Sequence, residues 1–174
     1  MKTYLQFINE NVEFLLDKES EEYQDLFNDY PIVDYTKVDS SLKESASESL
    51  DRFKNRIDLW KDIKIVFAKK LGGDLLGRFR SGTSTSTPII LLSIKEILSA
   101  SKKYNIPIWV TVETTVFHEL GHCICELERD IFGYKYLEYG DEEEWVEEFA
   151  YQLHEYDQIP NDLETFIEKY KKLK

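Results

Sequence analysis

The segment Val116-Phe117-His118-Glu119-Leu120-Gly121-His122 contains the pattern His-Glu-x-x-His within a stretch of helical periodicity. The recurrence of apolar residues every three or four positions predicts one long helix over residues 107–130. Both histidines fall almost opposite the apolar stripe of that helix, together with Cys125, so the periodicity does not explain them as core residues. The stripe itself consists of apolar residues that recur every three or four positions, at Trp109, Val112, Val116, Leu120, Cys123, Leu127 and Ile131.

Two histidines one helical turn apart are suited to bind one metal ion. Their Cβ atoms lie roughly 5–6 Å apart on a helix, so both imidazoles can reach a single tetrahedral Zn²⁺. Glu119 lies beside this pair, where it can take a proton from a water activated by the metal and later deliver it to a leaving amine. The alternative is that two histidines simply occupy a helix surface or a core. The chain has only 3 histidines, and the use of two of them in this pattern favours a metal site.

A catalytic zinc site normally has three protein ligands, so the histidines need a partner. The acidic segment 141–150 is predicted to begin a helix that ends near residue 156, with Asp141 as its N-cap and Glu144 as the capping-box partner. Glu143 and Glu147 lie along the edge of the apolar stripe of that helix. We therefore predict Glu143 as the third ligand and Glu147 as a second carboxylate that orients one histidine. The other candidates for the ligand are Glu142, Glu144, Glu147, His154 and Glu128, the last of which a straight helix would carry away from the site.

The remaining segments predict an α+β fold, with a small sheet in the middle of the chain and helices around it. Short β-type runs occupy residues 63–68, 75–80 and 89–92, separated by Gly72-Gly73 and by a loop of small residues at 81–88. Further helices are predicted over residues 4–17, 21–28, 41–60, 93–104 and 162–174. Ser41 and Glu44 form a capping-box signature, and Ser93 can cap the helix that follows it.

The composition argues against several kinds of partner. The 174 residues include 22 Lys and Arg against 34 Asp and Glu, which gives a net charge of −12. Nucleic acids and anionic membranes bind positively charged protein surfaces, so neither is expected as a partner of this acidic chain. No apolar stretch approaches the roughly 20 residues of a membrane span, and no signal peptide is visible. Cys123 and Cys125 make a poor disulfide framework, so we expect a reducing, cytoplasmic environment.

The segments Val116-Phe-His118-Glu119-Leu-Gly-His122 and Glu143-Glu-Trp-Val-Glu147-Glu-Phe-Ala150 together resemble the gluzincin metallopeptidases. In that family, His-Glu-x-x-His is followed by a second helix that carries Glu-x-x-x-Asp/Asn. The small size and the Phe-Ala pair are most similar to the compact ImmA/IrrE-type proteins, or minigluzincins, over residues 75–153. This chain has Glu147 where the family favours Asp or Asn, Val146 where Ala is usual, and no Leu-Leu-Met-Pro after the second motif.

The resemblance implies a zincin-like fold, in which a sheet of three strands lies over the active-site helix and residues 89–92 form the edge strand above the cleft. A peptide could pair with that edge and present its carbonyl to the metal. The resemblance also implies an intracellular protease that cleaves a particular protein partner. We expect a helical N-terminal extension at residues 1–60, packed on a metallopeptidase core at residues 61–174 as one compact unit.

The predicted function is zinc-dependent hydrolysis of peptide bonds, with one Zn²⁺ held by His118, His122 and Glu143 and with Glu119 as base and then acid. A further donor must stabilise the oxyanion. The candidates are His154, Tyr134, Tyr136, Tyr139 and Tyr151, which sequence cannot rank. Cys125 is interpreted as a small inert residue. The alternative function is a catalytically silent metal-binding domain that serves as a protein-interaction module.

Overall fold

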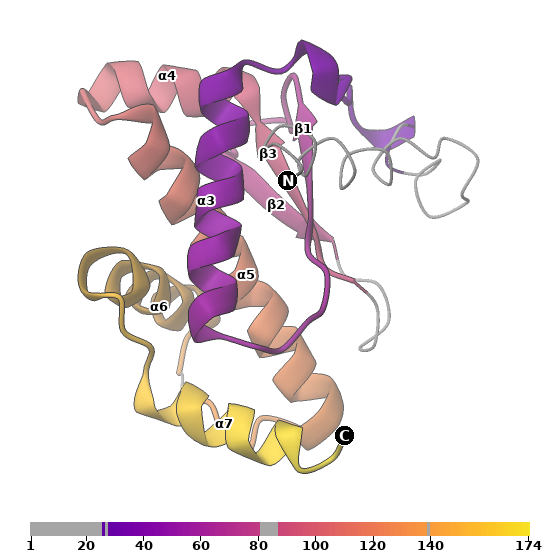
Figure 1. Ribbon diagram of the computed structural model, residues 1–174, viewed down its shortest axis with the longest axis vertical. Coiled ribbons are helices and arrows are strands. Elements are labelled where there is room, and N and C mark those ends of the chain that lie inside the picture. The colour runs from indigo at the N-terminus through magenta and orange to yellow at the C-terminus, as the bar shows by residue number, and fades with distance from the viewer. Residues whose placement is uncertain (1–25, 27, 81–86, 139) are drawn as a thin grey trace, which may run out of the picture.

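A computed structural model describes residues 26, 28–80, 87–138 and 140–174, and Figure 1 shows its elements. This part of the chain contains five α-helices and one three-stranded mixed sheet, the α+β class that was predicted. The helix predicted over residues 4–17, and most of the one over 21–28, lie outside the described residues. The helices are α3 (Ser40–Arg56), α4 (Ile94–Tyr104), α5 (Ile108–Phe132), α6 (Glu142–Tyr156) and α7 (Asn161–Lys171), and the strands are β1 (Lys64–Ala68), β2 (Gly77–Arg80) and β3 (Ile89–Ser93).

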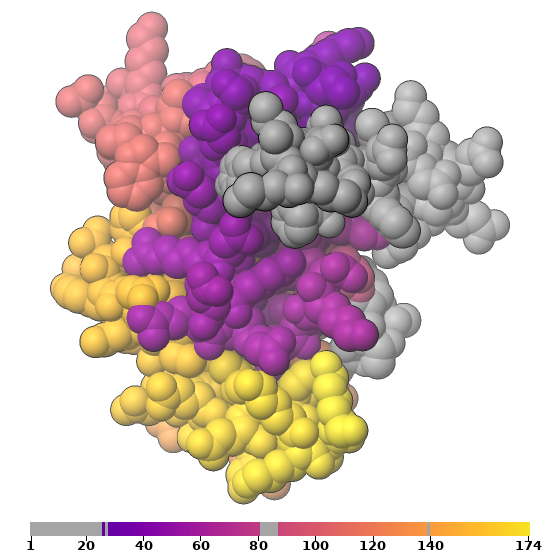
Figure 2. All heavy atoms as spheres, in the orientation of Figure 1, coloured from indigo at the N-terminus to yellow at the C-terminus, as the bar shows by residue number. Residues whose placement is uncertain are grey.

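The first of these helices, α3, packs along α5, and Figure 2 shows its outer face running down the middle of the molecule between α4 and α7. Its N-cap is Asp39, whose side chain accepts a hydrogen bond from the backbone N–H of Ser41 at 2.8 Å. The predicted capping box of Ser41 and Glu44 is therefore wrong, because the N-cap is Asp39, two residues before Ser41. The helix ends at Arg56, before residue 60, because the backbone becomes extended at the buried Ile57.

The described part of residues 1–60 shares a hydrophobic core with the rest of the chain. Leu42, Ala46 and Phe53 of α3 belong to the same buried cluster as Val116 and Phe117 of α5. Phe53 is completely buried in it. The helix α3 is thus integral to the core that supports α5, and the domain boundary at residue 60 stays a prediction.

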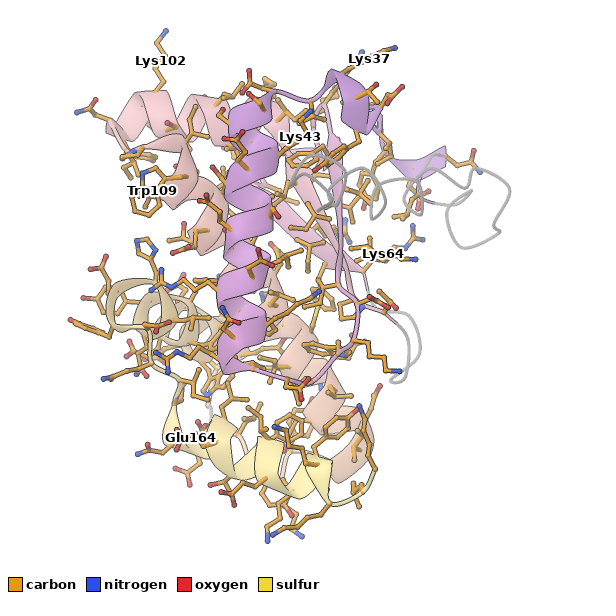
Figure 3. The ribbon with its side chains drawn as sticks, viewed as in Figure 1. Lys37, Lys43, Lys64, Lys102, Trp109 and Glu164 are labelled. Atoms are coloured by element: carbon orange, nitrogen blue, oxygen red, sulfur yellow. The ribbon has the colours of Figure 1, made fainter. Side chains whose placement is uncertain are left out.

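The long helix α5 begins and ends close to the predicted bounds of 107–130. Its buried surface is wider than the predicted stripe, because Phe117, Ile124 and Cys125 are also fully buried. Helices α3, α4 and α6 and strands β2 and β3 all contact α5, so more than one of its faces is covered. Trp109, at the start of the stripe, is 52% exposed and lies at the surface near α4 (Figure 3).

The sheet has the strand order β1-β3-β2, in which β1 and β3 are parallel and β2 is antiparallel to β3. The three predicted strands are confirmed, but the assignment of residues 89–92 to the edge is wrong, because β3 is the central strand. Every residue of β3 is buried, which suits a strand with neighbours on both sides. The edge strand beside α5 is β2, whose sequence Gly-Arg-Phe-Arg carries the charge typical of a sheet edge.

Both faces of β1 and β3 are largely buried, with side chains that alternate along each strand. Phe67 of β1 and Ile90 of β3 face the large core that contains α5. Val66 and Leu91 face a smaller cluster that also contains Leu26. The apolar composition of β1 and β3 on both faces therefore reflects two separate buried clusters.

The close approach of α6 to α5 depends on Gly121. An added Cβ at this position would lie 2.9 Å from Cγ1 of Val146 and 3.1 Å from the ring of Phe149, both of which are fully buried on α6. A larger residue would push the two helices apart, since Val146 is stiff about χ1. The contact at Gly121 brings the first turn of α6 beside the neighbouring His122.

The remaining helices follow the predicted pattern with small shifts. Ser93 caps α4 as predicted, by accepting a hydrogen bond from the N–H of Glu96. Asp141 caps α6 as predicted, although its side chain binds the N–H of Glu143 at 2.8 Å. The helix α7 begins one residue before its predicted start and ends three residues before its predicted end. Among the described residues, no helix combines the length and the apolar character that crossing a membrane requires.

Candidate metal centre

Three side chains from two helices converge as predicted. His118 and His122 of α5 approach each other with 3.2 Å between their Nε2 atoms. Glu143 of α6 places Oε2 at 3.4 Å from Nε2 of His118 and Oε1 at 3.2 Å from Nε2 of His122. A tetrahedral ion with bonds of about 2.0–2.1 Å holds its ligand atoms roughly 3.3 Å apart. The two oxygens of Glu143 face different imidazoles, and one ligand atom from each of the three residues lies within 4.8 Å of the others, so the group could bind a metal ion.

Local geometry explains the two histidines, and tertiary packing explains the carboxylate. Residues four apart on a helix lie one above the other, which aligns the two imidazoles. Glu143 is in the first turn of α6, which the contact between Gly121 and Val146 sets beside His122. The side chain of Glu143 is 64% exposed, so it reaches the imidazoles from the solvent side of the site.

The carboxylate that orients a histidine is Glu142, and the prediction of Glu147 for this role is wrong. Nδ1 of His122 donates to Oε1 of Glu142 at 2.8 Å. Arg129, about two helical turns beyond His122 on α5, donates to the other oxygen of Glu142 at 2.5 Å. Glu142 is the first residue of α6, and its side chain leans back toward α5, whereas Glu147 lies further along on an exposed part of α6. The bond at Nδ1 leaves the lone pair of Nε2 free to bind a metal.

We expect Glu142→Gln to weaken Zn²⁺ binding by about 10- to 100-fold, the usual cost of losing a partner that orients a ligand. An amide in this place can still accept one hydrogen bond but loses the charge that supports the imidazole and pairs with Arg129. Competition with a chromophoric chelator measures the affinity. Glu144→Gln, with the same loss of charge in the same turn, is the matched control. Equal affinities of the two variants would contradict the role of Glu142.

Glu119 lies within this site and is 7% exposed. Its Oε2 accepts the backbone N–H of Phe79 at 2.8 Å. Burial raises the pKa of Glu119 to about 7, while His122 and the N–H of Phe79 act in the opposite direction. A carboxyl group with a pKa near neutrality can both accept and return a proton at physiological pH. Glu119 therefore has the environment expected of a general base.

Strand β2 forms the wall of the site opposite α6. A Cβ on Gly77 would lie 2.6 Å from Cγ2 of Thr115 and 2.9 Å from Cγ of Glu119, so only glycine allows β2 to approach α5 this closely. The ring of Phe79 stacks on His122, with 5.6 Å between the centroids and 13° between the planes. Phe79 therefore packs against the face of the His122 ring, whereas Glu142 binds the ring at Nδ1.

Burial also favours the metal-binding form of His118. Its pKa is lowered, mainly because burial penalises the charged imidazolium and secondarily because His122 is close. The carboxylates of Glu143 and Glu147 oppose this shift. A neutral imidazole is the form that binds a metal ion, so the lowered pKa of His118 assists binding.

The site opens into a cleft of about 650 Å³. Sequence reasoning missed its far wall, which contains Tyr30 and Arg78. The alternation of charged residues in Gly77-Arg78-Phe79-Arg80 was a signal for an edge strand, but no local pattern connects that strand with α5. The cleft is lined by Asp29, Tyr30, Leu75, Gly77, Arg78, Phe79, Arg80, Leu91, His118, Glu119, His122 and Glu143.

The structure places His154 away from the predicted site. It lies eleven residues beyond Glu143 on the same helix, which corresponds to about 16 Å along the axis. Its Nδ1 donates to Oε1 of Glu113 at 2.7 Å, and Arg52 binds the same oxygen at 2.5 Å. His154 is therefore part of an ionic group that joins α3, α5 and α6, and its candidacy as a ligand or an oxyanion donor is not supported.

The other candidates for oxyanion stabilisation also have different surroundings. Tyr134 lies under Arg129, and Tyr151 contacts the hydroxyl of Tyr156. Tyr136 donates its backbone N–H to the fully buried Glu128, which removes Glu128 from the ligand candidates. None of these residues lines the cleft of the metal site. Tyr139 lies outside the described residues.

Cys125 was expected on the histidine side of α5, and it is instead fully buried. Burial raises the pKa of its thiol, and it also raises the pKa of Cys123. Both cysteines are free. A buried thiol with a raised pKa is a poor nucleophile and a poor ligand, so these environments fit inert packing residues.

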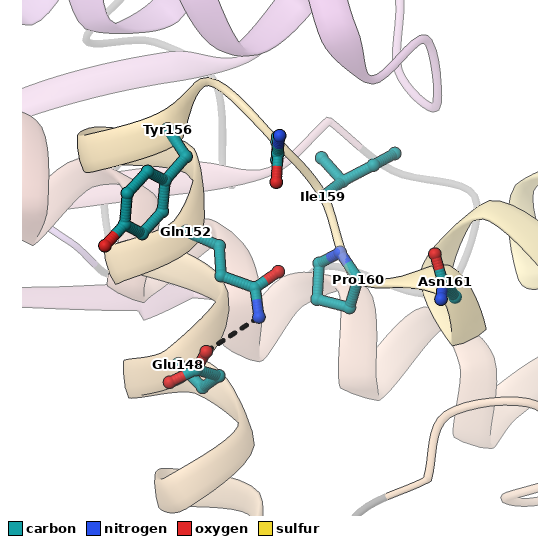
Figure 4. Close-up of a pocket in the computed structure, with 7 residues that line it drawn as sticks. Glu148, Gln152, Tyr156, Ile159, Pro160 and Asn161 are labelled. Carbon is teal, nitrogen blue, oxygen red and sulfur yellow. Dashed lines mark hydrogen bonds between the residues drawn. The ribbon is translucent and has the colours of Figure 1, made fainter.

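A second hollow lies between α6 and α7 (Figure 4). Gln152 and Glu148 of α6 are hydrogen-bonded to each other at 2.7 Å on one side of it. Ile159 and Pro160 of the connection to α7 form the other side. None of the predicted site residues lines this hollow, whereas His118, Glu119, His122 and Glu143 all line the cleft at α5.

Comparisons with protein-family models, with curated proteins and with solved structures found no match to this chain. The functional interpretation therefore rests on the geometry of His118, His122 and Glu143, on the burial of Glu119 and on the resemblance of the two motifs.

Proposed function

We propose that this protein is a zinc-dependent metallopeptidase of the gluzincin type with a zincin-like core. The observation that carries the proposal is the convergence of His118, His122 and Glu143, in which the two Nε2 atoms lie 3.2 Å apart and each faces one carboxylate oxygen of Glu143 at 3.2–3.4 Å, next to the buried Glu119. A purely structural metal site has no need of a carboxylate with a raised pKa beside its ligands. An N,N,O ligand set suits zinc, whereas Mg²⁺ and Ca²⁺ prefer oxygen ligands alone.

Each residue has a role in this proposal. When bound, Zn²⁺ acidifies a coordinated water and polarises a carbonyl group. Glu119 accepts a proton at its carboxylate and returns it to the leaving amine. Glu142 and Phe79 hold His122 in position, through the bond at Nδ1 and through ring stacking. The N–H of Phe79 holds the carboxylate of Glu119 before reaction.

The cleft provides a place for an extended peptide. In the described part of the chain, β2 is hydrogen-bonded to β3 along one edge only. The other edge of β2 lies at the metal site, where the N–H of Phe79 binds Glu119. A peptide that adds to this edge lies alongside the ligand atoms, which is the usual way that a sheet edge binds an extended chain. This role was expected for residues 89–92 and passes here to β2.

Removal of the metal tests the proposal. The purified chain is expected to contain about one zinc per molecule, measured by atomic emission, and to cleave members of a randomised decapeptide library, measured by mass spectrometry. Dialysis against a chelator should abolish cleavage, and Zn²⁺ should restore it where Mg²⁺ does not. Cleavage by the metal-free chain would contradict the proposal. A zinc-loaded chain that cleaves no member of the library would instead support a metal-binding interaction module.

A further inference from the structure

Two arginines follow the exposed edge of the cleft. Arg78 and Arg80 alternate with Phe79 on β2, so their side chains lie on the face of the strand opposite to the one that contacts His122. Both line the cleft that contains the ligand atoms. The chain has a net charge of −12, which repels anions, and these two arginines provide positive charge locally at the cleft.

The two arginines differ in their partners. Nη1 of Arg80 lies 3.3 Å from Oδ2 of Asp29, so this guanidinium already faces a carboxylate. Nη1 of Arg78 donates to the neutral hydroxyl of Tyr30 at 2.9 Å. Within the described ranges, no carboxylate forms an ion pair with Arg78. A guanidinium carries five N–H donors in a planar fork that matches a carboxylate, so one bond to Tyr30 orients the group and leaves most donors for a ligand.

The register of β2 places Arg78 close to the reacting groups. Gly77 precedes it and contacts Glu119, and Phe79 follows it and contacts both Glu119 and His122. A peptide added to this edge is extended, and its side chains alternate between the two faces. The peptide residue that pairs with Arg78 therefore has its side chain on the same face of the sheet as Arg78. This residue lies within about two residues of the scissile bond at the metal.

We propose that Arg78, oriented by Tyr30, is a specificity-determining residue that selects peptide substrates carrying Asp or Glu within two residues of the scissile bond. This inference rests on the proposed peptidase function. The ligand class follows from charge and shape, because the planar donor fork pairs with a carboxylate and an amide of equal size cannot accept two charge-assisted bonds.

The test uses the zinc-loaded full chain and a randomised decapeptide library. Wild-type protein is expected to favour Asp and Glu over Asn and Gln near the cleavage site by about 3- to 10-fold, the range for a partly exposed ion pair with good geometry. Arg78→Gln should remove this preference, and Tyr30→Phe should reduce it. Lys102→Gln removes one positive charge on α4, where the side chain points outward (Figure 3), and is expected to leave the preference unchanged. Zinc content and circular dichroism establish that each variant is folded.

A second arm separates failure of this inference from failure of the proposed function. The same library is passed over immobilised zinc-loaded Glu119→Gln protein, with and without Arg78→Gln, and the retained peptides are sequenced. Cleavage without preference for acidic residues overturns the inference and leaves the peptidase function intact. Absence of cleavage together with Arg78-dependent retention of acidic peptides overturns the peptidase function and supports acidic-peptide recognition by Arg78. Absence of both overturns both.

Discussion

A Glu119→Gln protein is expected to bind zinc like wild type and to cleave peptides about 10²- to 10⁴-fold more slowly, the usual contribution of a general base or acid. The amide can still accept the N–H of Phe79, so the packing of β2 on α5 is preserved. It cannot take up a proton, and the chemistry therefore loses its proton acceptor. Single-turnover cleavage of one library peptide by protein of verified zinc content measures the effect.

Glu126→Gln is the control for this loss, because it removes the same charge from the same helix on a residue that does not line the cleft. Its cleavage rate should equal that of wild type. If Glu119→Gln retains zinc and still cleaves at the wild-type rate, Glu119 is not the base.

Glu119→Gln is also expected to change how the stability of the metal-free protein depends on pH. The pKa of Glu119 is raised to about 7 in the folded state from 4.5, so the folded state binds the proton more tightly than the unfolded state does. Wild type therefore loses stability as the pH rises from about 4.5 to 7, and the Gln variant does not. The shift corresponds to about 3 kcal/mol at pH 8. Urea unfolding in chelator should show the variant gaining on wild type by this order of magnitude between pH 4 and pH 8, and a gap independent of pH would contradict the buried carboxylate.

Glu143→Ala is expected to reduce zinc affinity by more than about 100-fold, because loss of a ligand exceeds the cost of losing a residue that only orients one. Glu147→Ala should change the affinity by less than about 2-fold, since its contribution is a distant charge. The two residues lie one turn apart on α6, both are exposed, and alanine is favourable in a helix, so neither change should unfold the protein. Competition with a chromophoric chelator compares them directly.

Two outcomes would revise the ligand set. Loss of zinc only in Glu147→Ala would mean that the register of α6 against α5 is displaced by one turn. Unchanged affinity in both variants would mean that the two histidines hold the ion with another group.

The predictions that succeeded depended on short-range geometry. The bounds of α5 and the pairing of its histidines follow from a spacing of four residues in one helix. Asp141 and Ser93 were recognised as caps because capping involves atoms within three residues. The position of Glu143 near the two histidines was also predicted from a local pattern, since it lies at the edge of a buried stripe, and its role as a ligand stays a prediction.

The predictions that failed depended on how separate elements meet. Residues 89–92 were assigned to the edge of the sheet, but strand order is decided by which strands pair, and the pairing of β1 with β3 joins residues 25 positions apart, such as Lys64 and Ile89. Glu142 was considered only as a possible ligand, because it becomes the partner of Nδ1 of His122 only where the first turn of α6 meets α5. His154 was a candidate only while its partner Glu113, far away in the chain, was unknown.

Short-range sequence is thus enough to define the helix that carries His118, Glu119 and His122, because the distances among these residues are set by the pitch of one helix. The identity of the carboxylate that binds Nδ1 of His122, and of the strand that borders the cleft, arises only in the folded molecule. Both depend on contacts between elements far apart in the chain, namely α6 against Gly121 and β2 against Glu119. Such contacts are decided by packing of the whole core, which no local pattern contains.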